Sequence, residues 1–488
     1  MSKRVFSFFI LVLLGITIVF QACNREPVYT GDDVSIKFSV DTLMFDTVFT
    51  TIGSSTRFVK IYNNSDRHIQ AEIDIKENSF FRINVDGTPG PNVKNVSILG
   101  NDSIYIFVEV NINPDQPLDV SPFIIQDAIN ITVNGVKNTI YLEAFGQNAN
   151  YIPGQNVGGL SYKIPCNNGT YVLDDEKPYV IYGVMIVDSC TMVVTSGSKL
   201  YLHGGLVRTD NSLYNDGMIL VLKDGSVRFE GTIENPITIQ GDRLEPDYSD
   251  VPGQYAGIVL WQESKNNIFK YTNIKNAIVG IRMDSLAQME MYNCQIFNTS
   301  DAGISSRYSK AKIQNSLLYE NYGGGLIFSY GGQYDVQFCT VGSYIGQNPA
   351  LYISNYYCPE LPCDNRIQKA NLEANFTNCI FSGSQTDEVI LSQTDGSDFL
   401  YHFDHCLVRV DDLIKEQNFP DFFDHCISPI NYQDIRQPLF LDYNTNSFTL
   451  DTMSIAREKG RFISNIHTDI EGKLRKSVPD LGCYELNL

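Results

Sequence analysis

Apolar and polar residues alternate with a period of two in short segments of the first part of the chain. The pattern is clear at residues 34–40, 58–62, 104–110, 129–133 and 140–145. Such alternation places one face of a β-strand against a core and the other in solvent. Turn-forming residues separate the segments, as at Asp86-Gly87 and Asn134-Gly135. Five to seven short strands over about 115 residues predict a β-sandwich at residues 33–148.

The second part of the chain carries an internal repeat. One marker is a cysteine or serine in a short motif that recurs along the chain, and its first three positions are 22 and 23 residues apart: Cys294, Ser316, Cys339, then Cys379, Cys406 and Cys426. A second marker is a small residue before Ile or Leu, with separations of 23, 23, 22 and 25: Gly257, Gly280, Gly303, Gly325 and Ala350. Two independent markers with one period make coincidence an unlikely explanation.

This period, without helical spacing, is typical of one coil of a parallel β-helix, in which each coil buries its apolar face by stacking on the next. The sequence therefore predicts an all-β protein with a β-helix at residues 155–430. The 40 residues between Cys339 and Cys379 indicate an insertion, and residues 242–253 a loop that leaves the rod.

Three segments resemble known families. The order of FDTV (45–48), VKIYNN (59–64), LGNDS (99–103) and LEAFG (142–146) resembles immunoglobulin-like modules of the Hydin and major-sperm-protein type, which implies a spacer or protein-binding unit. The repeat is similar to right-handed parallel β-helix proteins. QPLFLD (437–442), TDIEGKLR (468–475) and PDLGCYE (479–485) resemble the closing segment of secreted Bacteroidota β-helix proteins, which implies a C-terminal cap at 431–488. Arg475 and Asp469 are expected to serve this cap.

The N-terminus has the features of an export signal. Lys3 and Arg4 precede an apolar run that is short for a membrane span, and Ala22-Cys23 follows. The arrangement resembles a bacterial lipobox, which implies a signal peptide at 1–22, lipidation at Cys23 and a tether at 23–32. A plain cleaved signal is the alternative. The resemblance to Bacteroidota lipoproteins favours the outer membrane, at the cell surface or on the periplasmic face.

Charge limits the partners. The chain has 36 Lys and Arg against 56 Asp and Glu, a formal net charge of −20. Nucleic acid is therefore not an expected partner, because its phosphates would be repelled. The same acidity disfavours polyuronate substrates.

The cysteines and histidines are interpreted mainly as structural. Cys358 and Cys363 predict a loop disulfide, as expected in an exported protein. The cysteines of the repeat are expected to stack as buried thiols. The positions before them predict a polar ladder that Phe338 interrupts: Asn293, Asn315, Asn378, His405 and His425.

No cofactor or metal site is assigned from the sequence. The twice-repeated Phe-Asp-His-Cys at 403–406 and 423–426 invites a metal or catalytic interpretation, but its register with the repeat explains it without chemistry. The acidic stretch 242–250 offers ligands for calcium without a recognised loop pattern.

Three functions remain open, in this order. The first is a non-enzymatic scaffold or accessory subunit of an outer-membrane β-barrel complex, for barrel assembly or uptake. The second is glycan binding through tyrosines such as Tyr330 and Tyr334. The third is glycan cleavage, for which no compact set of carboxylates is evident.

Overall fold

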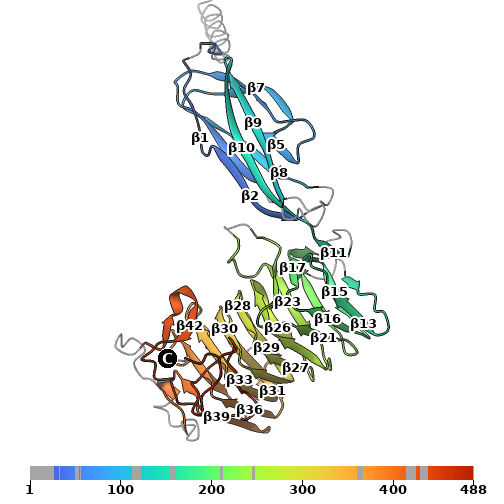
Figure 1. The fold of residues 1–488 in the computed structure, drawn as a ribbon, viewed down its shortest axis with the longest axis vertical. Helices are drawn as coiled ribbons and strands as arrows, with labels where there is room; N and C mark the ends of the chain where they lie inside the picture. The colour runs from blue at the N-terminus through green and yellow to red at the C-terminus, as the bar shows by residue number, and fades with distance from the viewer. Residues whose placement is uncertain are drawn as a thin grey trace, which may run out of the picture. The chain divides into compact units, whose positions relative to one another are not determined.

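The computed structural model describes residues 27–31, 33–49, 54, 56–112, 123–153, 161–208, 213–244, 248–359, 366–413, 425–428 and 438–486. The chain divides into two compact units, Met1–Asn148 and Ala149–Leu488. Both are built from strands, so the fold is all-β, with a sandwich followed by a right-handed parallel β-helix (Figure 1).

The first unit is a sandwich of two five-stranded sheets. One sheet has the order β1 (Ile36–Phe38), β3 (Arg57–Asn63), β8 (Ser103–Val110), β5 (Phe81–Val85) and β6 (Thr88–Pro89). The other has the order β2 (Thr42–Phe49), β10 (Val136–Gln147), β9 (Phe123–Val133), β4 (Ile69–Asp74) and β7 (Asn92–Ile98). All neighbours are antiparallel except β2 and β10, which are parallel.

The described part of the sandwich thus has ten strands, more than the five to seven predicted. The alternating segments correspond to β1, β3, β8, β9 and β10. Two of the missed strands show why a period of two was hard to see. β6 has only two residues, and β7 pairs with β4 through a bulge, with Asn95 in a left-handed conformation.

The rod of the second unit has three columns of parallel strands. The first contains β12 (Ser161–Lys163), β15 (Val184–Val187), β20 (Met218–Val221), β23 (Tyr255–Leu260), β26 (Ala277–Met283), the first halves of β29 (Ala302–Gln314) and β31 (Gly324–Gln337), β33 (Leu351–Ser354) and β38 (Val389–Ser392).

The second column contains β13 (Thr170–Leu173), β16 (Thr191–Thr195), β21 (Ser226–Glu230), β24 (Asn267–Lys270), β27 (Gln288–Tyr292), the second halves of β29 and β31, β36 (Leu372–Thr377) and β39 (Phe399–Asp404). Because β29 and β31 continue through the corner, the first two columns form one 16-stranded sheet.

The third column is a separate ten-stranded sheet. It contains β11 (Asn150–Ile152), β14 (Tyr179–Tyr182), β17 (Lys199–His203), β22 (Ile237–Gly241), β25 (Thr272–Lys275), β28 (Gln295–Thr299), β30 (Leu317–Asn321), β32 (Thr340–Ser343), β37 (Ile380–Gly383) and β40 (Leu407–Val408). The inward side chains of all three columns form one continuous apolar core.

The repeat markers found in the sequence coincide with this stacking. Ile258, Ile281, Ile304, Leu326 and Leu351 pair in direct register from coil to coil. The cysteine marker stacks in the same way. The residue after each marker donates its backbone N–H to the carbonyl of the marker in the preceding coil, as Leu317 does to Cys294. The predicted register of the β-helix is confirmed.

The corner between the second and third columns uses one left-handed residue per coil. Its φ values lie between 42° and 59° at Tyr271, Asn293, Asn315, Phe338, Asn378, His405 and His425. Asparagine tolerates this conformation better than other non-glycine residues. The predicted ladder before the cysteines is therefore a row of corner residues, and Phe338 shares its backbone conformation.

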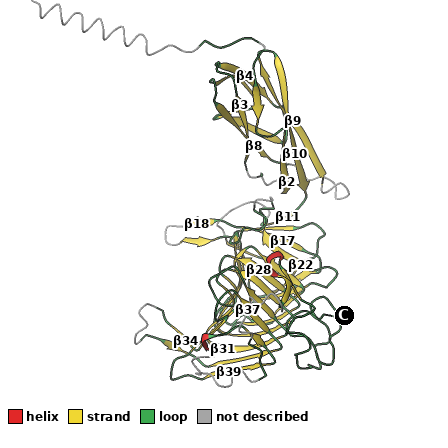
Figure 2. Ribbon diagram, turned by 90° about the vertical axis from the view of Figure 1, so that its left-hand side faces the viewer, coloured by secondary structure: helices red, strands yellow, loops and turns green. Residues whose placement is uncertain are grey.

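Two hairpins stand out from the rod in Figure 2. They are β18 (Leu206–Arg208) with β19 (Leu213–Asn215), and β34 (Tyr356–Tyr357) with β35 (Gln368–Lys369). The second lies within the insertion predicted between Cys339 and Cys379.

The C-terminal segment, residues 438–486, packs against the outer side of the third column. It contains β41 (Phe440–Asp442), a 3-10 turn η3 (Tyr443–Thr445) and β42 (Ser447–Leu450). Its Phe440, Phe448 and Leu481 form a second apolar cluster with Leu317 and Ile380 of the rod. The segment therefore covers a side of the rod that would otherwise expose apolar residues.

Candidate functional sites

The outer face of the second column is polar, and its side chains lie in rows along the rod. One row pairs Glu290, Lys312 and Asp335 from coil to coil. A parallel row pairs Tyr292 with Gln314, and Gln314 donates to Gln337 at 2.5 Å. Because coils repeat at about 4.8 Å, this face presents regularly spaced hydrogen-bonding groups.

One edge of this face, beside the corner with the third column, borders a groove that we call the aromatic groove. It is lined by Tyr271, Tyr292, Asn293 and Gln314 on the rod and by residues 465–468 of the C-terminal segment, and its volume is about 700 Å³. This lies within the range of about 300–1,000 Å³ typical of small-molecule sites.

The polar atoms of the aromatic groove are suited to neutral hydrogen bonding. The Tyr292 hydroxyl donates to Glu290 at 2.7 Å. Burial, more than any neighbouring charge, raises the pKa of both Tyr271 and Tyr292, so both hydroxyls stay protonated at neutral pH. The side-chain oxygen of Asn293 is buried without a hydrogen-bond partner. The groove thus combines aromatic surface with unused hydrogen-bonding capacity.

The far wall of the groove is fixed by the corner residues. Asn315 donates to the carbonyl of Thr468 at 2.8 Å and accepts from Arg475 at 2.8 Å. The Arg475 guanidinium lies 3.7 Å from the centre of the Phe338 ring. Phe338 therefore interrupts the polar ladder but supplies a cation–π partner for the C-terminal segment.

A second hollow lies where the first column meets the second. Its volume is about 470 Å³, and its lining includes Tyr308, Lys310, Glu373 and Asp398. Its charged side chains come from several coils, and it offers less aromatic surface than the aromatic groove.

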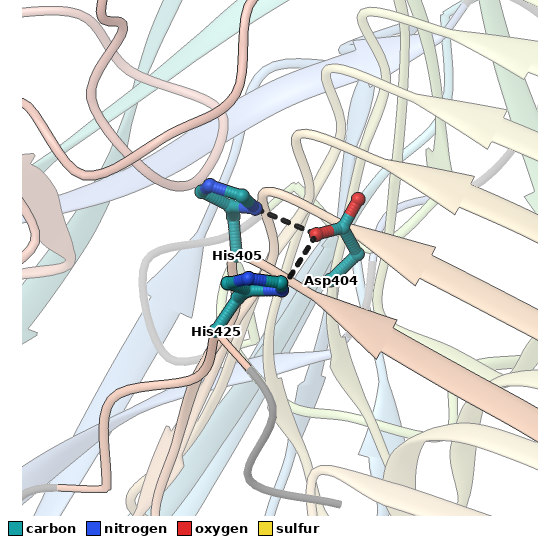
Figure 3. Close-up of side chains that lie close together, drawn as sticks. All are labelled: Asp404, His405 and His425. Atoms are coloured by element: carbon teal, nitrogen blue, oxygen red, sulfur yellow. Dashed lines mark hydrogen bonds and ion pairs between the residues drawn. The ribbon is translucent and has the colours of Figure 1, made fainter. Parts of the chain in front are cut away.

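Figure 3 shows a third site, at the last described coils of the rod. His405 Nδ1 lies 2.6 Å from Asp404 Oδ1, and His425 Nδ1 lies 3.9 Å from the same oxygen. Arg461 binds the other oxygen of Asp404 at 2.9 Å. Asp404 and His405 come from one copy of the repeated motif and His425 from the other, while Asp424 lies outside the described residues.

The tyrosines predicted to contact glycans occupy two different environments. Tyr334 is 2% exposed and its ring stacks on Phe328 at 3.8 Å inside the rod. The prediction that Tyr334 contacts a sugar is therefore wrong, because this side chain belongs to the core. Tyr330 is half-buried at the opposite corner, beside Tyr308 and Tyr357.

The cysteines are mostly internal. Cys294, Cys339, Cys379 and Cys406 are buried free thiols, and burial raises the pKa of Cys294 to about 12. The Cys294 thiol is therefore protonated and unreactive at neutral pH. Cys426 is a half-buried free thiol.

One disulfide was missed in the sequence. Cys166 and Cys190 are bonded, and their separation of 24 residues, about one coil, was the available signal. Cys358 is disulfide-bonded, but Cys363 lies outside the described residues, so their pairing stays a prediction. Cys23, the predicted lipidation site, also lies outside them.

The acidic stretch considered for calcium is partly engaged within the protein. Asp242 pairs with His203 at 2.6 Å and raises the pKa of that imidazole. Residues 245–247 are outside the described part of the chain. Within the described residues, we find no helix with the length and apolar character needed to span a membrane.

Comparisons with known proteins support the description of the rod. A protein-family model described as "Right handed beta helix region" matches residues 162–341. No curated protein matches the chain significantly.

Solved structures give only weak overall similarity. The E. coli chaperone DraB is 12% identical to this chain, with a TM-score of 0.17. The match covers 23% of this chain and 54% of the DraB chain. The PapD-like domain 7 of human CEP192 is 7% identical, with a TM-score of 0.18. The match covers 25% of this chain and 92% of the CEP192 domain. The catalytic domain of a GH87 alpha-1,3-glucanase in complex with nigerose is 12% identical, with a TM-score of 0.18. The match covers 74% of this chain and 81% of the glucanase chain. The chain thus spans about half the length of DraB.

Proposed function

We propose that the β-helix is a saccharide-binding rod that holds a neutral glycan in the aromatic groove. The observation that carries the proposal is the combination of Tyr271 and Tyr292 with the amides of Asn293 and Gln314 in one groove. The C–H faces of sugar rings pack on aromatic rings, and amide groups both donate to and accept from sugar hydroxyls.

Charge and carboxylate content favour binding of a neutral glycan over cleavage of an acidic one. The net charge of −20 disfavours polyuronates. Among the described residues that line the groove, Glu290 is the only carboxylate, whereas glycoside hydrolysis ordinarily requires a pair. The proposed role is therefore recognition.

Exchange of groove residues for their counterparts in neighbouring coils tests this proposal. Tyr271→Asn introduces the residue type of the next two corners, Asn293 and Asn315. Tyr292→Gln introduces the residue type of Gln314, which pairs with Tyr292 in the next coil. Each change should weaken binding of neutral oligosaccharides on a glycan array at least about tenfold, because about 1.4 kcal/mol of lost stacking corresponds to that factor. Tyr322→Ala, at a 40% exposed tyrosine outside the groove, is the control. Unchanged binding in both groove variants, or no glycan bound by the parent chain, would refute the proposal.

A second function, partner binding at the outer membrane, is favoured by an aromatic patch on the sandwich. Phe58 on β3 pairs across the strands with Phe107 on β8, and these side chains are 51% and 41% exposed. Tyr105 lies beside both rings. Phe107 also borders a hollow of about 740 Å³ that includes Asn84 and Pro89. Exposed aromatic clusters of this kind are enriched in protein interfaces.

This second proposal includes a lipid at Cys23 and an outer-membrane β-barrel protein as the partner. Mild-detergent purification of the chain from membranes should recover one stoichiometric barrel protein. The double variant Phe58→Ser/Phe107→Ser should lose it, whereas Tyr141→Ser, at a 60% exposed position of the opposite sheet, should retain it. Cys23→Ser should move the chain to the soluble fraction. Retention of the barrel protein by the double variant would contradict the proposed docking surface.

A further inference from the structure

The last two corners of the ladder differ chemically from the others. Three earlier corners hold asparagine, at Asn293, Asn315 and Asn378. The last two hold His405 and His425, whose φ values are 53° and 59°. The two imidazole rings lie nearly parallel, 5.2 Å apart with an interplanar angle of 16°. The repeated backbone therefore presents both rings in the same orientation.

Both rings direct Nδ1 towards one carboxylate oxygen, as Figure 3 shows. One ligand atom each from Asp404, His405 and His425 lies within 4.8 Å of the other two. Ligand atoms in a tetrahedral zinc site are about 3.3 Å apart, given bonds of about 2.0–2.1 Å. The distances of 2.6 Å and 3.9 Å to Asp404 Oδ1 fall on either side of this value, so small side-chain shifts would accommodate an ion.

The carboxylate is held so that one oxygen remains directed at the imidazoles. The Asp404 side chain is 9% exposed, and Arg461 binds its Oδ2. Arg461 is itself fixed by the Asn378 side chain, which accepts from the Arg461 N–H and donates to its carbonyl, both at 2.7 Å. An outer group that fixes a ligand in this way is a common feature of metal sites.

We propose that Asp404, His405 and His425 bind one divalent transition-metal ion, with Zn²⁺ as the favoured ion. Two imidazole nitrogens and one carboxylate oxygen suit Zn²⁺ better than Ca²⁺ or Mg²⁺, which prefer oxygen ligands throughout. The His425 side chain is 60% exposed, so the ion can enter from solvent and a water can complete its coordination. The ion would tie His425 to the preceding coil.

Titration of Zn²⁺ into the metal-free full chain, followed by calorimetry, tests the site. We expect the parent chain to bind one equivalent of Zn²⁺. The double variant His405→Asn/His425→Asn should bind Zn²⁺ at least about tenfold more weakly. Asparagine occupies the equivalent corners of three earlier coils, so the variant should keep its fold, which circular dichroism can verify. His402→Asn, on the same strand but outside the cluster, is the matched control and should bind like the parent.

A second readout separates a metal site from a simple Asp–His contact. Zn²⁺ should protect the amides of residues 425–428 from hydrogen exchange in the parent and control chains but not in the double variant. Mild acidification should abolish this protection, because protons compete with the metal for imidazole. Absence of Zn²⁺ binding by the parent, or equal affinity in the double variant, would overturn the proposal.

Discussion

Replacement of Arg475 by methionine is expected to destabilise the packing of the C-terminal segment by about 3–5 kcal/mol, the usual cost of removing one member of a buried ion pair. The Arg475 and Glu485 side chains are 1% and 0% exposed. Arg475 also donates to Asn315 and to the carbonyl of Gly482. Methionine would leave Glu485 buried without its counter-charge and remove the cation–π contact with Phe338.

Hydrogen exchange of the segment measures this effect. The Cys483 amide donates to Thr340 of the rod, so it reports whether the segment is docked. The amides of Lys473 and Glu485 donate to Asp469, so they report the internal order of the segment. The control is Lys473→Met, which removes an ion pair with Glu471 whose side chains are 39% and 48% exposed. That change should cost less than about 1 kcal/mol. Similar protection in Arg475→Met and the control would show that the buried pair contributes little.

The stacking of the rod could be predicted because its cause is local and repeated. Residues that occupy the same place in successive coils meet the same neighbours, so the same residue types recur at the period of the coil. The row from Ile258 to Leu351 is such a case, and the structure pairs its members directly. Short irregular strands such as β6 and β7 gave no comparable periodic signal.

The sites were harder to predict because they depend on corners and on distant segments. Tyr330 and Tyr334 lie on either side of a bend at Gly331 and Gly332, where φ is 75° and 116°. Counting alternate residues across such a bend does not tell which side chain points inward. The aromatic groove joins residue 271 to residues 465–468, and no local pattern links them.

The histidine cluster shows a different limit of sequence reasoning. The register of the two Phe-Asp-His-Cys copies correctly indicated a structural corner at His405 and His425. A corner position does not exclude a ligand role, since the same stacking that orders the backbone also aligns the imidazoles beside Asp404. Structure and chemistry can therefore share one residue.

Removal of the Cys166–Cys190 disulfide should destabilise the N-terminal coils by about 3 kcal/mol, as estimated from the entropy of closing a loop of this length. Cys166 precedes β13 and Cys190 precedes β16, and these two strands pair in parallel near the start of the rod. A terminal coil has a neighbour on only one side, so a covalent link there prevents fraying that interior coils resist by stacking.

The double variant Cys166→Ser/Cys190→Ser tests this role. Exchange of the Thr191 amide, which donates to the Gly169 carbonyl at 2.9 Å, should become faster, while amides of β29 and β31 in the middle of the rod should change little. A reductant should reproduce the effect in the parent chain and have none at this amide in the variant, because Cys358, the other described disulfide cysteine, lies far along the sequence. Parent-like protection of Thr191 in the variant would mean that strand pairing alone holds the first coils together.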